Sequence, residues 1–234
     1  MDDQKLKRVL PDIYRRLFKR YGPQRWWPAE EPFEVIVGAI LTQSAAWANV
    51  EKAIANLKKA GKLSPDALRR LPETELASLI HPCGYYNVKA RKLKAFTRWL
   101  EEQYNDSLDK LFAQDIDDLR SRLLAVYGIG EETADSIILY AGNKPIFVID
   151  TYTRRIIDRL GLSPRPNSYP ACQKLFMTSL PADAALFNEY HALLVRLAKE
   201  TCRKQPLCAQ CCLNPGGVSG VAPASGRFPC TSFI

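Results

Sequence analysis

Apolar residues recur at helical spacing along most of the chain. Clear examples are the segments 35–40, 123–127 and 137–140, where apolar side chains return every three to four positions. Convincing alternation of the kind that predicts a β-strand is absent, and the apolar run 145–149 is interpreted as a loop that enters a helix. The pattern therefore predicts an all-α fold.

Capping residues divide the chain into separate helices. Ser64, Pro72 and Ser107 each precede a helical pattern and are expected to start a helix, whereas Gly161 is expected to end one. Residues 213–234 are rich in Gly, Pro and Ser, and we expect them to lack regular structure.

A glycine turn inside residues 124–156 is the most informative feature. The segment predicts a helix, a turn that contains Gly128 and Gly130, a second helix, and an isolated Asp150 beyond it. The two glycines allow a tight turn and a close approach by a partner. A helix that begins near Glu131 would direct its first N–H groups at that partner, and a phosphate suits such a position. An ordinary connection between two helices fits the same glycines, so the turn alone does not decide.

Four motifs, in order along the chain, carry a family resemblance. They are the segment ILTQS, the segment CGYYNVKA, YGIGEETAD with VIDTYTRRI after it, and the spacing Cys202-x5-Cys208-x2-Cys211. Together they resemble the endonuclease III (HhH-GPD) superfamily of DNA glycosylases over roughly residues 33 to 211. The closest similarity in motifs is to the endonuclease III-like 3-methyladenine DNA glycosylases.

The resemblance implies a two-domain architecture and a nucleic-acid partner. A six-helix barrel with the helix–hairpin–helix is expected at residues 31–143, and a second helical domain at 1–30 plus 144–234. The family's catalytic cleft lies between the two, so the hairpin and Asp150 are expected at its mouth. The implied partner is damaged double-stranded DNA, bound by a monomer because base flipping needs one cleft per duplex.

Composition agrees with a polyanion as partner. The chain has 234 residues with 33 Lys+Arg against 25 Asp+Glu, a net charge of +8 and a pI near 9.1. Such a balance fits nucleic acid or simply a basic soluble protein. No apolar run reaches the ~18–20 residues of a membrane span, and the charged N-terminus does not resemble a signal peptide. The seven cysteines, an odd number, do not suggest a secreted disulfide framework, so a cytoplasmic protein is expected.

Asp150 matches the catalytic aspartate of the family. A glycosylase breaks the N-glycosidic bond through a transition state with positive charge on the sugar, and a nearby carboxylate stabilises that charge and orients water. The alternative role of Asp150 is to cap the helix that follows it. Both roles are compatible, since helix N–H donors would keep the carboxylate ionised.

The hairpin departs from the bifunctional members of the family at one position. These carry a lysine two residues after the second glycine, and here Glu132 takes its place. A carboxylate cannot form a Schiff base, so the sequence predicts a monofunctional glycosylase without lyase chemistry at that position. Another amine such as Lys144 is the alternative. Glu132 itself also fits a solvated acid that suits the helix dipole.

Three tryptophans are candidates for the base pocket. Trp26 and Trp27 precede the first barrel helix, and Trp47 follows the glutamine motif. Aromatic faces favour a cationic alkylated purine over a neutral base by ~1–2 kcal/mol. The alternative is that the tryptophans anchor the core, where large aromatic residues commonly pack.

Candidate DNA contacts come from the matched motifs. They are Gln43, Lys89, Gly128, Gly130 and Thr133. Gln43 would fill the gap left by the flipped nucleotide, although the alignment slips by one residue, so Ser44 could take that place, and a polar residue on a wet helix face also fits. Lys89 opens a basic run that suits phosphates, and a solvated helix face fits that run equally.

The C-terminal cysteines are candidate metal ligands. Cys202, Cys208 and Cys211 resemble three of the four thiolates of the family's [4Fe–4S] cluster. The fourth thiolate is missing at the expected spacing, and Cys230 is the candidate to replace it. Zinc is the alternative metal. His191 matches no ligand pattern and is expected to be a helix residue, either packed or exposed.

Three functions remain open from the sequence. The first is a monofunctional DNA glycosylase of base excision repair that removes alkylated purines, with 3-methyladenine as the expected base. The second changes the substrate to thymine or uracil in G·T or G·U mismatches, since other relatives without the lysine act there. The third is a DNA-binding module without catalysis, against which Asp150 argues.

Overall fold

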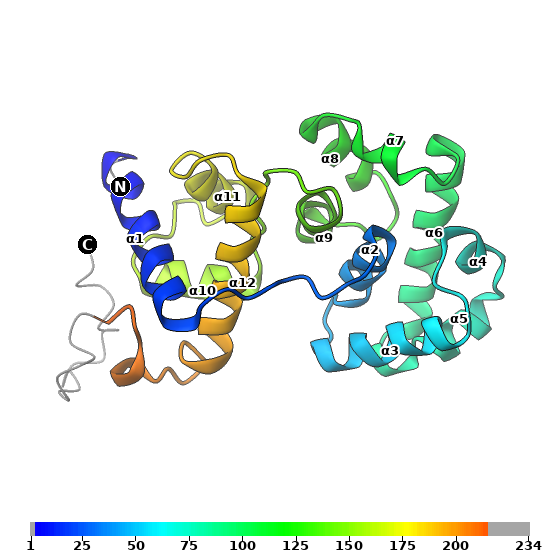
Figure 1. Cartoon of the computed structure of the whole chain (residues 1–234), viewed down its shortest axis with the longest axis horizontal. Coiled ribbons are helices and arrows are strands. Elements are labelled where there is room, and N and C mark those ends of the chain that lie inside the picture. The colour runs from blue at the N-terminus through cyan, green and yellow to red at the C-terminus, as the bar shows by residue number, and fades with distance from the viewer. Residues whose placement is uncertain (1–2, 215–234) are drawn as a thin grey trace. The chain divides into compact units, whose positions relative to one another are not determined.

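The computed structural model describes residues 3–214 and confirms the predicted all-α fold (Figure 1). Over that range it contains no strand. The helices are α1 (Asp3–Tyr21), α2 (Pro32–Leu41), α3 (Trp47–Lys59), α4 (Pro65–Arg70), α5 (Glu73–Leu79), η1 (His81–Cys83), α6 (Tyr86–Tyr104), α7 (Leu108–Phe112), α8 (Ile116–Leu124), α9 (Glu131–Ser136), η2 (Ile137–Ala141), α10 (Thr151–Arg159), α11 (Tyr169–Met177), α12 (Ala184–Glu200) and η3 (Cys208–Gln210). In the described range, no helix has both the length and the apolar character that crossing a membrane requires.

The chain forms two compact units. One comprises residues 27–144 and is called the hairpin unit. The other, the aspartate unit, comprises the described residues up to Trp26 and from Pro145 onward. The boundaries expected from the family resemblance lie at residues 31 and 143.

The hairpin unit is built around α2. Residues 33–41 of this helix are all buried, which explains why its sequence is apolar except for Glu34, whose carboxylate pairs with Lys58. α2 packs against α3, α6, α9 and η2. α2 therefore holds α9, the second helix of the predicted hairpin, in a fixed position relative to α6.

The predicted helix boundaries are confirmed where a capping residue marks them. The Ser64 hydroxyl accepts from the backbone N–H of Ala67 at the start of α4, and the Ser107 hydroxyl accepts from that of Lys110 at the start of α7. Pro72 precedes α5, as expected. Gly161 has a φ of +69° just after the end of α10, a conformation that suits glycine.

An aromatic core stabilises the aspartate unit. Phe147 stacks on Phe176 with ring centroids 4.0 Å apart, and Tyr190 of α12 meets Phe147 edge-on. The Tyr190 hydroxyl donates to the backbone carbonyl of Leu10 at 2.9 Å, which ties α1 to α12. Residues 146–149 are buried and non-helical, so the predicted loop enters α10 through the core and fixes the position of Asp150.

Candidate functional site

The glycine turn joins α8 and α9 as predicted, but the protein itself requires only one of its two glycines. Gly128 has a φ of +81°, and a Cβ placed on it would lie 2.6 Å from Cδ of Lys92, closer than atoms can approach. Gly130 has an extended φ of −97° and no atom near its missing Cβ. At Gly128 the predicted close approach is therefore made by the Lys92 side chain of the protein itself. The space beside Gly130 is open to a partner.

The side-chain amide of Gln43 joins three segments of the hairpin unit. Its Nε2 donates to the backbone carbonyl of Gly128 at 3.0 Å and to the Thr133 hydroxyl at 2.9 Å. Its Oε1 accepts from the ammonium group of Lys92 on α6. Each end of the amide thus meets a group of complementary polarity. The turn between α2 and α3 is consequently bonded to the hairpin and to α6.

Thr133 and Lys89 lie inside the unit rather than at its surface. Thr133 is 7% exposed, and its hydroxyl accepts from Gln43. Lys89 is 2% exposed, and its Nζ donates to the backbone carbonyl of Cys83 at 2.8 Å. Burial lowers the pKa of Lys89. The prediction that Lys89 contacts a phosphate is corrected accordingly, because its ammonium group is enclosed by the protein and closes the turn before α6.

Asp150 lies at the N-terminus of α10, in a polar environment that keeps it ionised. Its Oδ1 accepts from the backbone N–H of Thr153 at 2.6 Å, so the capping role is present. Its Oδ2 lies 3.7 Å from Nε2 of His191 on α12. Burial alone would raise the pKa of Asp150, but His191 and the Thr153 hydrogen bond outweigh it and place that pKa below its ordinary value.

His191 is a site residue that the sequence analysis missed. It is 6% exposed and is brought to Asp150 by the packing of α10 against α12. Forty-one positions separate the two residues, and no local spacing signals such a contact. His191 is thus a packed helix residue, as the sequence predicts, and packing also brings its Nε2 to 3.7 Å from the candidate catalytic carboxylate, a contact that the sequence does not predict.

Glu132, which the resemblance places at the lysine position of the bifunctional enzymes, is exposed in the first turn of α9. Acidic side chains are favourable at a helix N-terminus, so Glu132 suits the helix dipole. A carboxylate offers no amine to attack a sugar. The hairpin therefore lacks a nucleophile at this position.

Two of the three predicted pocket tryptophans contact each other in the hairpin unit. Trp27 meets Trp47 edge-on at 5.0 Å between ring centroids and lies 5.2 Å from the ring of Tyr140. A Cβ on Gly38 would lie 2.9 Å from Trp27, so a glycine in α2 makes room for the indole ring. All three aromatic rings are half-buried. Trp26 is half-buried as well but belongs to the aspartate unit.

Two exposed tyrosines were also missed. Tyr127 in the glycine turn is 58% exposed, and Tyr85 just before α6 is 73% exposed. Tyr85 adopts a left-handed conformation with a φ of +47°, which is unfavourable for a bulky side chain. Sequence patterns carry no signal for such a conformation at tyrosine. Both rings are available to a partner of the hairpin unit.

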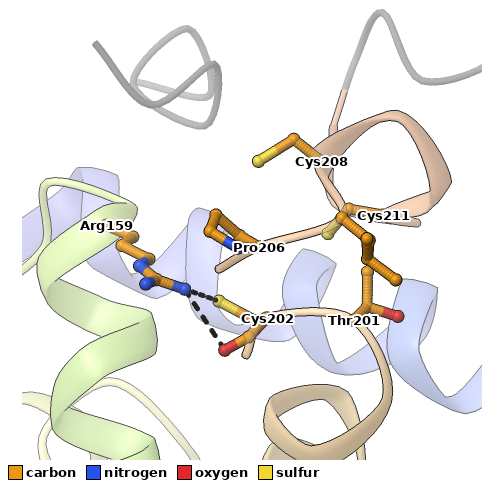
Figure 2. A pocket seen from close by; sticks show the side chains of 7 residues that line it. Arg159, Thr201, Cys202, Pro206, Cys208 and Cys211 are labelled. Carbon is orange, nitrogen blue, oxygen red and sulfur yellow. Dashed lines mark hydrogen bonds between the residues drawn. The ribbon is translucent and has the colours of Figure 1, made fainter. Parts of the chain in front are cut away.

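The three clustered cysteines line one pocket with Arg159 (Figure 2). The Arg159 guanidinium donates to Sγ of Cys202 at 3.2 Å and to the backbone carbonyls of Cys202, Arg203 and Lys204. Cys230 lies outside the described residues. Within residues 3–214, no three cysteine, histidine or acidic side chains are close enough to hold one metal ion. The described part of the chain thus supplies soft sulfur ligands around a shared pocket, but not a complete set of four thiolates.

Comparisons with known proteins agree with the motif resemblance. The family model described as HhH-GPD superfamily base excision DNA repair protein matches residues 37–182. A proposed DNA repair glycosylase of Methanocaldococcus jannaschii is 44% identical over 201 residues, which cover 85% of this chain and 91% of that protein. Endonuclease III of Sulfolobus acidocaldarius is 31% identical over 184 residues, which cover 78% of this chain and 79% of that enzyme. The structure of the H. pylori 3-methyladenine DNA glycosylase bound to 1,N6-ethenoadenine has a TM-score of 0.69 at 26% identity, covering 86% of this chain and 98% of that one.

Proposed function

Because the chain belongs to the HhH-GPD superfamily of base excision DNA repair proteins, we propose that it is a monofunctional DNA glycosylase that removes alkylated purines from duplex DNA. The observation that carries the proposal is the position of the Asp150 carboxylate, which lies at the N-terminus of α10 with Oδ2 3.7 Å from Nε2 of His191. A protein that only bound DNA would gain a cap for α10 from Asp150, but it would not need a second carboxylate oxygen facing His191.

The carboxylate suits the chemistry of base removal. As the bond between sugar and base breaks, positive charge develops on the sugar, and a fixed negative charge stabilises that transition state. Oδ2 of Asp150, which faces His191 and does not cap the helix, is the oxygen proposed to orient a water molecule for attack on the sugar carbon. The base leaves with the electrons of the broken bond, and water supplies the new oxygen at that carbon.

The absence of a lysine in the hairpin supports hydrolysis rather than strand cleavage. Glu132 takes the lysine position and cannot form the imine through which a lyase acts. The product expected from this protein is therefore an intact abasic site.

The aromatic cluster supports an alkylated purine as substrate. Trp27, Trp47 and Tyr140 offer half-buried ring faces and edges in the hairpin unit. A purine alkylated on a ring nitrogen carries positive charge, which aromatic faces attract by ~1–2 kcal/mol once water is excluded. Such a cationic base is also a good leaving group, so no strong acid is required. The similar H. pylori enzyme is named as a 3-methyladenine glycosylase, which agrees with this substrate class.

Base release from methylated duplex DNA tests the proposal. We expect the full-length chain to release 3-methyladenine and to leave strands that break only after alkali treatment, because hydrolysis ends at an abasic site. Release is measured by separating the free bases, and strand breaks by denaturing electrophoresis with and without alkali. Duplexes with a G·T or G·U mismatch are assayed in parallel, and alkali-sensitive sites appearing only there would establish the mismatch substrate instead. Breaks without alkali would contradict the monofunctional assignment.

We further propose that Cys202, Cys208 and Cys211 hold a [4Fe–4S] cluster whose fourth ligand is Cys230. The shared pocket and the Arg159 hydrogen bond to Cys202 support this assignment, since such bonds favour the thiolate form. A cluster here would supply structural cross-linking of the segment after α12.

Metal analysis of anaerobically purified protein tests the cluster. We expect iron and acid-labile sulfide in the wild-type chain, and loss of both in Cys208→Ser, because a missing thiolate opens the site. Cys83→Ala, which removes a buried thiol of the hairpin unit, serves as the matched control and should retain the metal. Bound zinc without sulfide would favour a zinc site, and a metal-free wild type would contradict both.

A further inference from the structure

Gln43 is bonded to the hairpin instead of pointing away from it. Its amide donates to Gly128 in the turn and to Thr133 in α9, and accepts from Lys92 of α6. We propose that Gln43 is a positioning residue that holds the glycine turn in the shape that contacts DNA, and that it does not enter the duplex. This role presupposes the duplex binding proposed above.

The glycine turn needs a restraint of this kind. Gly128 has no Cβ, so its backbone has more conformations open to it than that of any other residue type unless neighbouring groups restrain it. The Gln43 amide donates to the Gly128 carbonyl within the turn and to the Thr133 hydroxyl in α9. One side chain therefore links the turn to the helix that follows it. A turn fixed before binding loses less conformational entropy when a phosphate docks on it.

Lys92 completes the arrangement from the other side. Its aliphatic chain covers Gly128 so closely that only a hydrogen atom fits there, and its ammonium group bonds to Oε1 of Gln43. The positive charge of Lys92 is thereby held beside the turn, where it adds to the attraction for a phosphate. On the same turn, Tyr127 is exposed and Gly130 has open space around it.

Insertion of Gln43 into DNA would require all three of its hydrogen bonds to break. Each bond to a charged or half-buried partner is costly to lose without replacement. The next residue, Ser44, is exposed, has a φ of +53° and lies in the same turn between α2 and α3. The α2–α3 turn can therefore approach DNA through Ser44 while the amide of Gln43 stays in place.

Duplex binding at several salt concentrations separates the two roles of Gln43. The dissociation constant of an undamaged duplex and the single-turnover rate of base release at saturating protein are measured for wild type and Gln43→Leu. For a positioning role, we expect the dissociation constant of Gln43→Leu to rise about tenfold. The slope of log K against log salt should fall by about 0.9, the value of one lost phosphate contact. The saturated rate should stay within about twofold of wild type, since a positioning residue at the turn takes no part in base flipping or in the chemical step.

An inserted side chain predicts the opposite result. Undamaged duplex would then bind Gln43→Leu with an unchanged salt slope, and the saturated rate would fall because flipping is impaired; that result would overturn the positioning role. Thr133→Val removes one acceptor of the Gln43 amide and should reproduce the binding defect, whereas Thr133→Ser should not. If Gln43→Leu fails to fold, Thr133→Val carries the same comparison.

Two controls distinguish failure of the positioning role of Gln43 from failure of the proposed function. Gln114→Leu makes the same chemical change at a half-buried residue of the hairpin unit whose amide donates to the nearby carbonyl of Lys110, and it should leave binding unchanged. A wild-type chain that binds no duplex would overturn the proposed function. If the wild-type chain binds duplex, and Gln43→Leu and Thr133→Val have the same dissociation constant and the same salt slope as wild type, the positioning role alone is overturned.

Discussion

Asp150→Asn is expected to slow base release by about 100- to 1,000-fold under single-turnover conditions, the range seen when one electrostatic stabiliser of a transition state is removed. The amide is neutral, so it cannot stabilise positive charge on the sugar. Its oxygen can still accept from the Thr153 N–H, and asparagine caps helices about as well as aspartate. Duplex binding and thermal stability should therefore stay close to wild type.

Asp183→Asn is the matched control for this substitution. Asp183 caps α12 in the same unit, accepting from the N–H groups of Ala185 and Leu186 at 2.8 and 3.1 Å. Its replacement makes the same chemical change at a helix N-terminus without His191 nearby, and base release should be unchanged. An Asp150→Asn protein that binds duplex and releases base at the wild-type rate would remove Asp150 from the mechanism.

The ionisation of Asp150 also sets the pH range in which it contributes. Its pKa is below the ordinary value of 3.8 in the folded chain, because His191 and Thr153 together outweigh burial. A lowered folded-state pKa stabilises the fold above the ordinary pKa, and that contribution disappears as the pH falls through the lowered value. Asp150 is therefore charged throughout the neutral range, and loss of activity near neutral pH would have to come from another group.

Local signals allowed the sequence to predict most of the fold. Ser64 and Ser107 cap helices through hydrogen bonds to residues three positions away, so nearby sequence determines the boundary. The glycine turn was predictable because Gly128 adopts a conformation that other residues avoid. Asp150 was found because the residue that caps α10 is also part of a recognisable motif.

Long-range packing explains what the sequence did not predict. Lys89 and Lys94 belong to a basic run that suggests a wet surface, yet both ammonium groups are buried against backbone carbonyls of η1 and α4. His191 reaches Asp150 only because α12 packs against α10. The partners of Gln43 lie 85 and 90 positions away. Periodicity describes which face of a helix is apolar, but not which distant group satisfies a particular polar atom.

Arg120→Met is expected to lower the free energy of unfolding of the hairpin unit by about 3 kcal/mol, the lower end of the range for breaking a buried ion pair. Arg120 on α8 donates from Nε to Oδ1 of Asp135 on α9 at 2.7 Å, and from Nη2 to Oδ2 at 3.3 Å. The Asp135 side chain is fully buried, so removing its cation leaves a charge that water cannot solvate. The lower end applies because the Arg120 side chain is 21% exposed and its charge is partly screened.

A control substitution separates the cost of breaking the Arg120–Asp135 ion pair from the cost of losing any arginine side chain. Arg70 pairs with Asp66 at 2.8 Å, but their side chains are 81% and 49% exposed, so Arg70→Met should cost less than about 1 kcal/mol. Urea unfolding gives the stabilities, and hydrogen exchange of the α8 and α9 amides reports on the hairpin itself.

The double variant Arg120→Met with Asp135→Leu should recover much of the lost stability, because neither charge of the buried pair remains. Equal costs for Arg120→Met and Arg70→Met would mean that direct packing of α8 against α9, and not the ion pair, holds the two helices of the hairpin together.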